Sequence, residues 1–170
     1  YEDFVIFPFK LTIPKDLAKF DIVAEYNNTK MFIVPEEANN LPGIGFVEGM
    51  ACGSAYIGLN DSMYIDIGIL PGVHYICYDG TLEDLKIKIK YYQNHNDELE
   101  KIANAGYEFV KEKILDVTTV SRWDLDVSVV EKALKEHKSG KFDHGFMLWK
   151  ILQLALFQPS MQSEANQPYP

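Results

Sequence analysis

A glycine-rich segment in the first third of the chain, residues 42–53 (PGIGFVEGMACG), most constrains what the chain can fold into. Its order of residue types predicts a loop, a short apolar helix and a glycine stop, and residues 55–59 (AYIGL) then fit a strand. Gly43 and Gly45 let the backbone approach a ligand closely. The unpaired N–H groups at the start of the helix suit a phosphate. Glu48 is a charge among apolar residues, so it needs a partner or a hydroxyl-bearing ligand unless it points to solvent.

Composition narrows the class of protein. The 170 residues are 47% hydrophobic, which favours one globular domain with a substantial core. A formal charge of −9 disfavours a nucleic-acid surface, because phosphate neutralisation needs clustered Lys and Arg. Cys52 and Cys77 could pair in principle, but free cysteines are commonly buried as small hydrophobes. Since no secretory signal is evident and the cysteine usage fits a reducing compartment, we expect a cytoplasmic protein.

Ahead of the glycine segment, the pattern predicts strands and one helix. We expect a buried strand at residues 3–9 that ends at Pro8, a helix from near Pro14 to Tyr26, a strand at 30–34 and a polar loop at 36–41. The chain starts at Tyr1 rather than at a methionine, so we expect a processed chain or a piece of a longer one.

Beyond the glycine segment, helices dominate. Residues 63–70 fit either a short helix or a loop, and 73–78 fit a strand. Thr81 and Asp84 have the spacing of a helix cap, which predicts a helix at 82–93. Three-four spacing of apolar residues predicts further helices from near Asp97 and around 127–138. We expect residues 1–158 to form one domain and residues 159–170 to form a disordered tail.

Residues 146–157 (FMLWKILQLALF) are apolar on nearly every side but shorter than the roughly 20 residues of a membrane span. We expect a helix that docks against an N-terminal domain or a partner subunit. The alternative is a helix lying on a membrane surface, as a peripheral membrane contact.

Two other nucleotide-binding classes fit poorly. The segment lacks the third glycine of G-x-G-x-x-G and follows a polar loop, which disfavours a dinucleotide-binding oxidoreductase. No G-x-x-x-x-G-K-[ST] occurs, which disfavours a P-loop hydrolase. The four histidines, among them His74 after a Pro-Gly turn, show no zinc-binding spacing, so we expect them to be packed or at the surface.

The order E-G-M-A-C-G followed by a strand resembles the nucleotide-sugar site of GT-B glycosyltransferases, in which Glu-x-x-Ala-x-Gly opens a helix of the C-terminal domain. The later segments 78–85 (YDGTLEDL) and 103–110 (ANAGYEFV) extend the resemblance toward the CgeB-like group, over residues 30–123. The resemblance implies an α/β fold, with a Rossmann-like parallel sheet flanked by helices and additional C-terminal helices. The family has several βα units before its Glu-bearing helix, whereas about one fits here, so either residues are missing or the domain is reduced.

The resemblance also implies site residues. Glu48 would bind the ribose hydroxyls, and backbone N–H groups of the turn Gly43, Ile44, Gly45 and Phe46 would hold the diphosphate. Lys10 stands where the family places a cation against the diphosphate, although a solvated lysine is the alternative. Many members carry a further glutamate eight residues before the ribose-binding one; Asn40 occupies that position here, so donor-sugar contacts differ.

The implied activity is transfer of a sugar from a UDP- or GDP-sugar donor to a sugar or glycoconjugate acceptor. The resemblance suggests retention of anomeric configuration and neither a cofactor nor a tightly held metal. In the family, the acceptor site and any general base come largely from an N-terminal domain, which we expect to be absent from this sequence, so we name no catalytic base. The alternative is a non-catalytic sugar-nucleotide-binding or assembly module.

Overall fold

The computed structural model describes residues 2–6, 9–13, 20–37 and 42–156. In chain order the elements are β1 (Glu2–Ile6), β2 (Phe9–Ile13), α1 (Ile22–Asn27), β3 (Met31–Ile33), α2 (Gly45–Cys52), β4 (Ala55–Leu59), α3 (Ser62–Asp66), β5 (Ile76–Tyr78), α4 (Leu82–Asn94), α5 (Asn96–Ile114), α6 (Val117–Arg122), α7 (Val127–Lys138) and α8 (Gly145–Leu156). The predicted tail, residues 159–170, lies outside the described residues.

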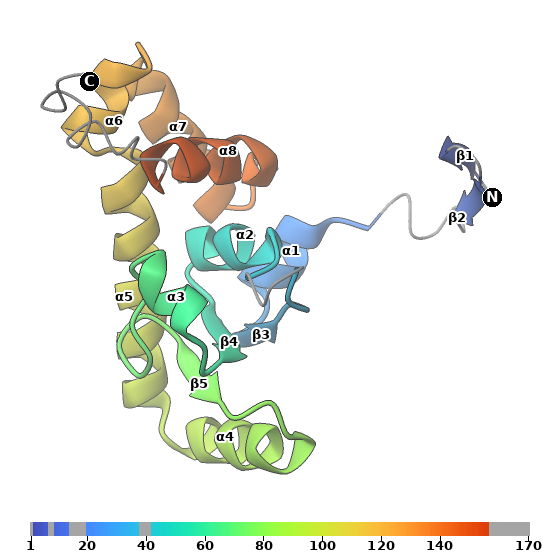
Figure 1. Ribbon diagram of the computed structural model, residues 1–170. Coiled ribbons are helices and arrows are strands. Elements are labelled where there is room, and N and C mark those ends of the chain that lie inside the picture. Colours follow the sequence, from blue (N-terminus) through green and yellow to red (C-terminus); the bar gives the residue numbers. More distant parts are fainter. Residues whose placement is uncertain (1, 7–8, 14–19, 38–41, 157–170) are drawn as a thin grey trace, which may run out of the picture.

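The centre of the fold is a parallel sheet of order β3-β4-β5 (Figure 1). Met31 pairs with Ala55 and Ile57 pairs with Ile76, so the three short strands run in one direction. Helices cover the sheet: α2 and α8 lie above it in Figure 1, α4 lies below it, and α5 runs alongside. This arrangement confirms the predicted α/β fold with C-terminal helices.

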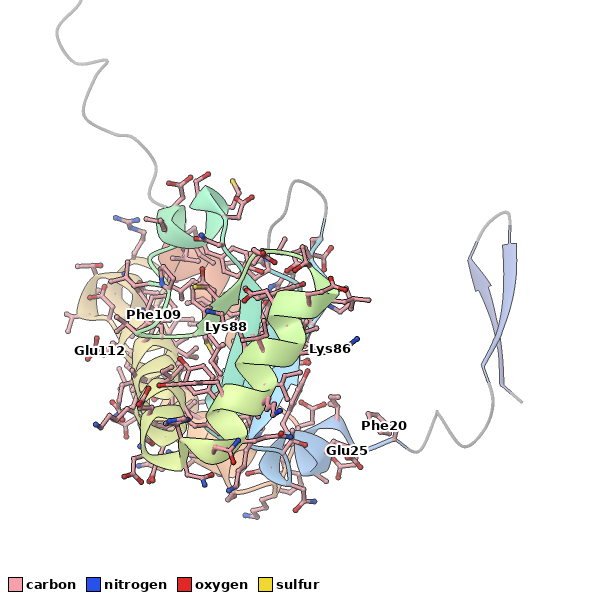
Figure 2. The ribbon with its side chains drawn as sticks, turned by 90° about the horizontal axis from the view of Figure 1, so that it is seen from below. Phe20, Glu25, Lys86, Lys88, Phe109 and Glu112 are labelled. Carbon is pink, nitrogen blue, oxygen red and sulfur yellow. The ribbon has the colours of Figure 1, made fainter. Side chains whose placement is uncertain are left out.

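The alternation of side chains along the strands divides the core between the two faces of the sheet. On β4, Tyr56 enters the larger cluster with Phe32, Met50 and the helices α2, α7 and α8. Its neighbours Ala55 and Ile57 point to the other face and pack with the first half of α5. The helix α4 packs here through Leu85, Ile89 and Tyr92, whereas Leu82 at its start is exposed. Figure 2 shows α4 in front of the sheet with Lys86 on its outer side.

Several predicted boundaries are confirmed by local hydrogen bonds. Gly53 ends α2 in the left-handed conformation at φ 87°, which favours glycine. The Thr81 side chain accepts a hydrogen bond from the N–H of Asp84 at 3.1 Å and begins α4. α7 ends at Lys138 with Ser139 as its cap, and Gly140 follows with φ 71°. The ambiguous stretch 63–70 starts as the short helix α3 and turns at Gly68.

Other predictions near the N-terminus are wrong. Residues 3–9 do not form one strand, because β1 pairs with β2 in an antiparallel hairpin of its own sheet and Ile6 lies opposite Phe9. Both halves of this segment are rich in strand-forming residues and can pair with each other locally. The predicted helix from near Pro14 does not run through Asp21, whose side chain caps the start of α1 by accepting from the N–H of Ala24. Residues 14–19 lie outside the described part.

The strand predicted at 73–78 is shorter than expected. The Nδ1 atom of His74 accepts a hydrogen bond from the N–H of Leu70 at 3.1 Å, and the N–H of Gly72 donates to the Tyr75 carbonyl. These bonds hold the first part of the segment in a turn, so β5 begins only at Ile76. The helix α6 was not among the sequence predictions; its local signal is Asp116, whose side chain accepts from the N–H groups of Thr118 and Thr119.

Candidate functional site

The glycine turn packs directly on the end of β3. A Cβ atom at Gly43 would lie 2.5 Å from the Pro35 carbonyl oxygen, and one at Gly45 would lie 2.8 Å from the Tyr26 hydroxyl. Neither glycine has a positive φ. Lack of space, rather than backbone conformation, therefore requires glycine at both positions. This close packing sets where α2 begins.

The start of α2 carries backbone donors that find no acceptor in the described part of the chain. The N–H of Phe46 donates to the Gly43 carbonyl and that of Val47 to the Ile44 carbonyl, so both are used within the turn. The N–H groups of Ile44 and Gly45 bond to no acceptor in residues 20–37 or 42–156. Two donors at the positive end of a helix form a feature that can bind an anion.

A cavity of about 610 Å³ opens beside this helix start. Its walls come from the segments that follow β3 and β4 and from α8, and most of them are apolar; the lining residues are Glu37, Pro42, Ile44, Phe46, Ile67, Trp149, Leu152, Gln153 and Leu156. In open parallel sheets, ligands bind beyond the carboxyl ends of the strands, which is where this cavity lies. Its volume is in the range of small-molecule sites.

Glu48 is half-buried, whereas the other residues of α2 are buried. A Cβ atom at Gly145 would lie 2.5 Å from the Glu48 Cγ and 2.7 Å from its Oε1, so the carboxyl group rests on the first residue of α8. Burial, and second the neighbouring Asp143, raise the pKa of Glu48. No Lys or Arg of the described residues forms an ion pair with it. Glu48 does not line the cavity itself.

His137 on α7 joins these elements. Its side chain is fully buried, and its Nδ1 accepts a hydrogen bond from the backbone N–H of His144 at 3.1 Å. The Nε2 atom therefore carries the proton and donates to the backbone carbonyl of Glu48 at 3.0 Å. Burial lowers the pKa of His137, which keeps the imidazole neutral. The sequence shows only that His137 lies on the apolar face of its helix, so this role is not visible there.

Two further groups beside Glu48 are held in their neutral forms. Burial, with Glu48 second, raises the pKa of Tyr26 to about 12. Burial, followed by Asp143 and Glu48, raises the pKa of the Cys52 thiol to about 12. Cys52 and Cys77 are both free, so they do not pair. The Cys52 thiol therefore remains protonated, and the negative charge near α2 comes from Glu48 and Asp143.

The remaining predicted site residues lie apart or outside the described part. Asn40 is outside the described residues, and so is the side chain of Lys10, whose backbone belongs to β2. His74, which the sequence predicts to be packed or at the surface, packs on Phe109 with ring centres 5.1 Å apart; it does not line the cavity. Within the described residues, no group of three or more His, Cys, Asp or Glu side chains could hold a metal ion.

The apolar segment expected to dock on another domain or subunit forms α8. One side of this helix packs inside its own chain, where Leu148, Ile151 and Leu152 are buried with α2 and α5. Much of the apolar character of the segment is thus accounted for within the chain. Phe146 is 58% exposed and stacks on Trp149, which is partly buried against the core. Among the described residues, no helix is long and apolar enough to cross a membrane.

A family model for glycosyl transferase-like proteins matches residues 4–122, well over half of the 170 residues. The chain belongs to this glycosyl transferase-like family. The match contains the glycine turn, α2 with Glu48, and the helices α4 and α5. It ends before α7 and α8, so His137, Asp143 and Gly145 come from outside the matched segment. Comparisons with curated proteins and with solved structures found no match.

Proposed function

We propose that this chain is the donor-binding portion of a glycosyltransferase that transfers a sugar from a UDP- or GDP-sugar to a sugar or glycoconjugate acceptor. Membership of the glycosyl transferase-like family supports the reaction class. The observation that supports the site is Glu48: a half-buried carboxylate with no cationic partner in the described part of the chain. It lies one helix turn from two N–H groups that bond to no acceptor in that same part. A ribose diol supplies the donors that such a carboxylate lacks.

In this proposal, each part of the site has one task. The ionised Glu48 accepts hydrogen bonds from the ribose hydroxyls. The N–H groups of Ile44 and Gly45 hold the diphosphate, and the dipole of α2 stabilises the negative charge that builds on it as the sugar leaves. The cavity beside the turn accommodates the apolar faces of the donor. Contacts to the acceptor come from another domain or subunit.

Calorimetric titration of UDP and GDP into the chain tests the site. We expect Glu48→Ala to weaken binding of the preferred nucleotide at least about tenfold, because the ribose loses its charged acceptor. Glu25→Ala is the matched control, since Glu25 is an exposed carboxylate on α1 (Figure 2) and does not line the cavity. Equal affinities of wild type and Glu48→Ala would refute the role of Glu48, and a wild type that binds neither nucleotide would refute the function.

A further inference from the structure

Two parts of the chain that are far apart in sequence meet at Glu48. One is α2, which carries Glu48. The other is the turn that leads from α7 into α8. Gly145 at the end of this turn leaves room for the Glu48 side chain only because glycine has no Cβ. The position of the carboxyl group therefore depends on how these two parts are held together. His137 is hydrogen-bonded to both of them.

We infer that His137 is a positioning residue for Glu48. Its ring fixes the backbone of α2 at Glu48, and it also fixes the start of α8, on which the Glu48 carboxylate rests. This inference deepens the proposed function and rests on it. His137 does not touch the nucleotide in this arrangement; it acts through Glu48.

The geometry of the imidazole supports this role. A backbone N–H can only donate, so the bond from His144 to Nδ1 at 3.1 Å fixes the tautomer and orients Nε2–H toward the Glu48 carbonyl at 3.0 Å. Since His137 is fully buried, water cannot replace either bond. The residue bonded to Nδ1 directly precedes Gly145. One rigid ring thus sets the distance between α2 and the start of α8.

The turn itself is braced by a second set of contacts. The Glu136 carboxylate accepts from the Lys141 ammonium and from His144 Nε2, each at 3.1 Å. The Asp143 carboxylate accepts from the N–H of Gly145 at 2.8 Å. These bonds keep the turn compact, but none of them reaches α2. Among the described residues, two side-chain hydrogen bonds join α2 to this end of α7. The Nε2–H of His137 donates to the Glu48 carbonyl at 3.0 Å, and the Cys52 thiol makes a longer bond of 4.0 Å to the His137 carbonyl.

Three substitutions separate the two hydrogen bonds. His137→Gln keeps a donor at the position of Nε2, His137→Asn keeps an acceptor at the position of Nδ1, and His137→Leu removes both. Leu134→Ala is the matched control, because it opens a buried site on the same helix without changing either bond. The titrations use UDP and GDP, with denaturant unfolding measured in parallel.

We expect His137→Leu to weaken nucleotide binding about tenfold, His137→Asn to weaken it less, and His137→Gln to remain within about threefold of wild type. Leu134→Ala should lose stability and keep its affinity. If affinity instead follows stability across all four variants, His137 has only a structural role and the inference is wrong.

A second readout needs no nucleotide. Carbon-13 NMR of the carboxyl groups reports the pKa of Glu48, which is raised above its usual value of 4.5 by burial and Asp143. The groups that face Glu48 are Asp143, Tyr26, Cys52 and His137 itself. We expect His137→Leu to move this pKa back toward 4.5, and His137→Gln and Leu134→Ala to leave it raised. An unchanged pKa in His137→Leu would overturn the inference.

The two proposals can fail separately. If the wild type binds neither nucleotide but the pKa of Glu48 shifts as expected in His137→Leu, the proposed function is refuted, and His137 is still the residue that places Glu48.

Discussion

The two faces of the central sheet are built from different kinds of residues. The face under α4 and the first half of α5 packs Ala55, Ile57, Ile76, Leu99 and Ile102, which are aliphatic. The face under α2 buries the rings of Tyr56, Tyr64 and Tyr75 together with His137, and it places Glu48 half in the interior.

This contrast shows which face of the sheet accommodates buried polar groups. Every buried polar side chain needs a hydrogen-bond partner, so a face that contains many of them must be ordered by specific bonds as well as by apolar contact. On the α2 face the Tyr56 and Tyr64 hydroxyls are 2.9 Å apart, and the Tyr64 hydroxyl donates to the Glu36 carboxylate. The buried residues of the aliphatic face have no polar side-chain groups and need no such bonds; the tyrosines that pack there are only partly buried. The candidate site lies on the face that is specified more tightly.

The largest expected effect comes from the closest packing on the α2 face. A Cβ atom at Gly49 would lie 2.5 Å from Cε1 of the Phe32 ring. We expect Gly49→Ala to lower the free energy of unfolding by about 3 kcal/mol, even though alanine favours helix by about 1 kcal/mol. Ile57→Val on the aliphatic face should cost only about 1 kcal/mol. Urea denaturation measures both, and a loss in Gly49→Ala no larger than that in Ile57→Val would remove the contrast.

The tyrosine pair gives a directional prediction. Since Tyr64 donates to Glu36, Tyr56 must donate to Tyr64. Tyr64→Phe leaves the fully buried Tyr56 hydroxyl without its acceptor, so we expect a loss of about 2 kcal/mol. Tyr56→Phe removes the donor at the end of the chain of bonds and should cost about 1 kcal/mol. Thermal unfolding of the two variants gives the order, and a larger loss in Tyr56→Phe than in Tyr64→Phe would contradict this prediction.

On the aliphatic side, the expected sensitive point is a helix cap rather than a buried polar group. Thr81 accepts from the N–H of Asp84 at the start of α4. We expect Thr81→Ala to cost about 1 kcal/mol in chemical denaturation, while Thr81→Ser keeps the oxygen and stays close to wild type. Equal losses in both variants would mean that the methyl group, and not the cap, matters here.

The smallest effect separates stability from binding at Glu48. The pKa of Glu48 is raised in the folded state, so folding favours the protonated side chain. This contribution to stability is complete below the unfolded-state pKa of 4.5, and it is lost as the pH rises through the raised pKa of the folded state. Glu48→Gln should therefore be slightly more stable than wild type at neutral pH, by less than about 1 kcal/mol because solvent screens a half-exposed group. The difference should vanish below about pH 4. Denaturation curves from pH 4 to pH 8 test this, and a variant that is less stable at pH 7 would contradict it.

Local patterns in the sequence predict much of the α2 region and of the helices. Gly53 as a stop, the strand at 55–59 and the Thr81 cap depend on residues within a few positions of each other, so sequence spacing is sufficient. The same reasoning fails for partners that are distant in sequence. His137 and Glu48 are 89 positions apart, and no periodicity indicates that one ring would bond that carbonyl.

The apolar segment at 146–157 and the N-terminal hairpin show the same limit. Composition identifies a helix with a large apolar surface, but it does not tell whether the surface meets α2 of the same chain or another protein. Likewise, strand-forming residues around 2–13 fit one strand or two, and the choice depends on pairing.

The missing Cβ of Gly145 has a practical consequence for domain exchange. The family-matched segment ends at residue 122, so a chimera joined there would carry Glu48 but replace the glycine on which it rests and the histidine that holds it. Any other side chain at the equivalent of position 145 would displace the carboxylate. A transplantable module should therefore extend through α8, with its fusion point after Leu156.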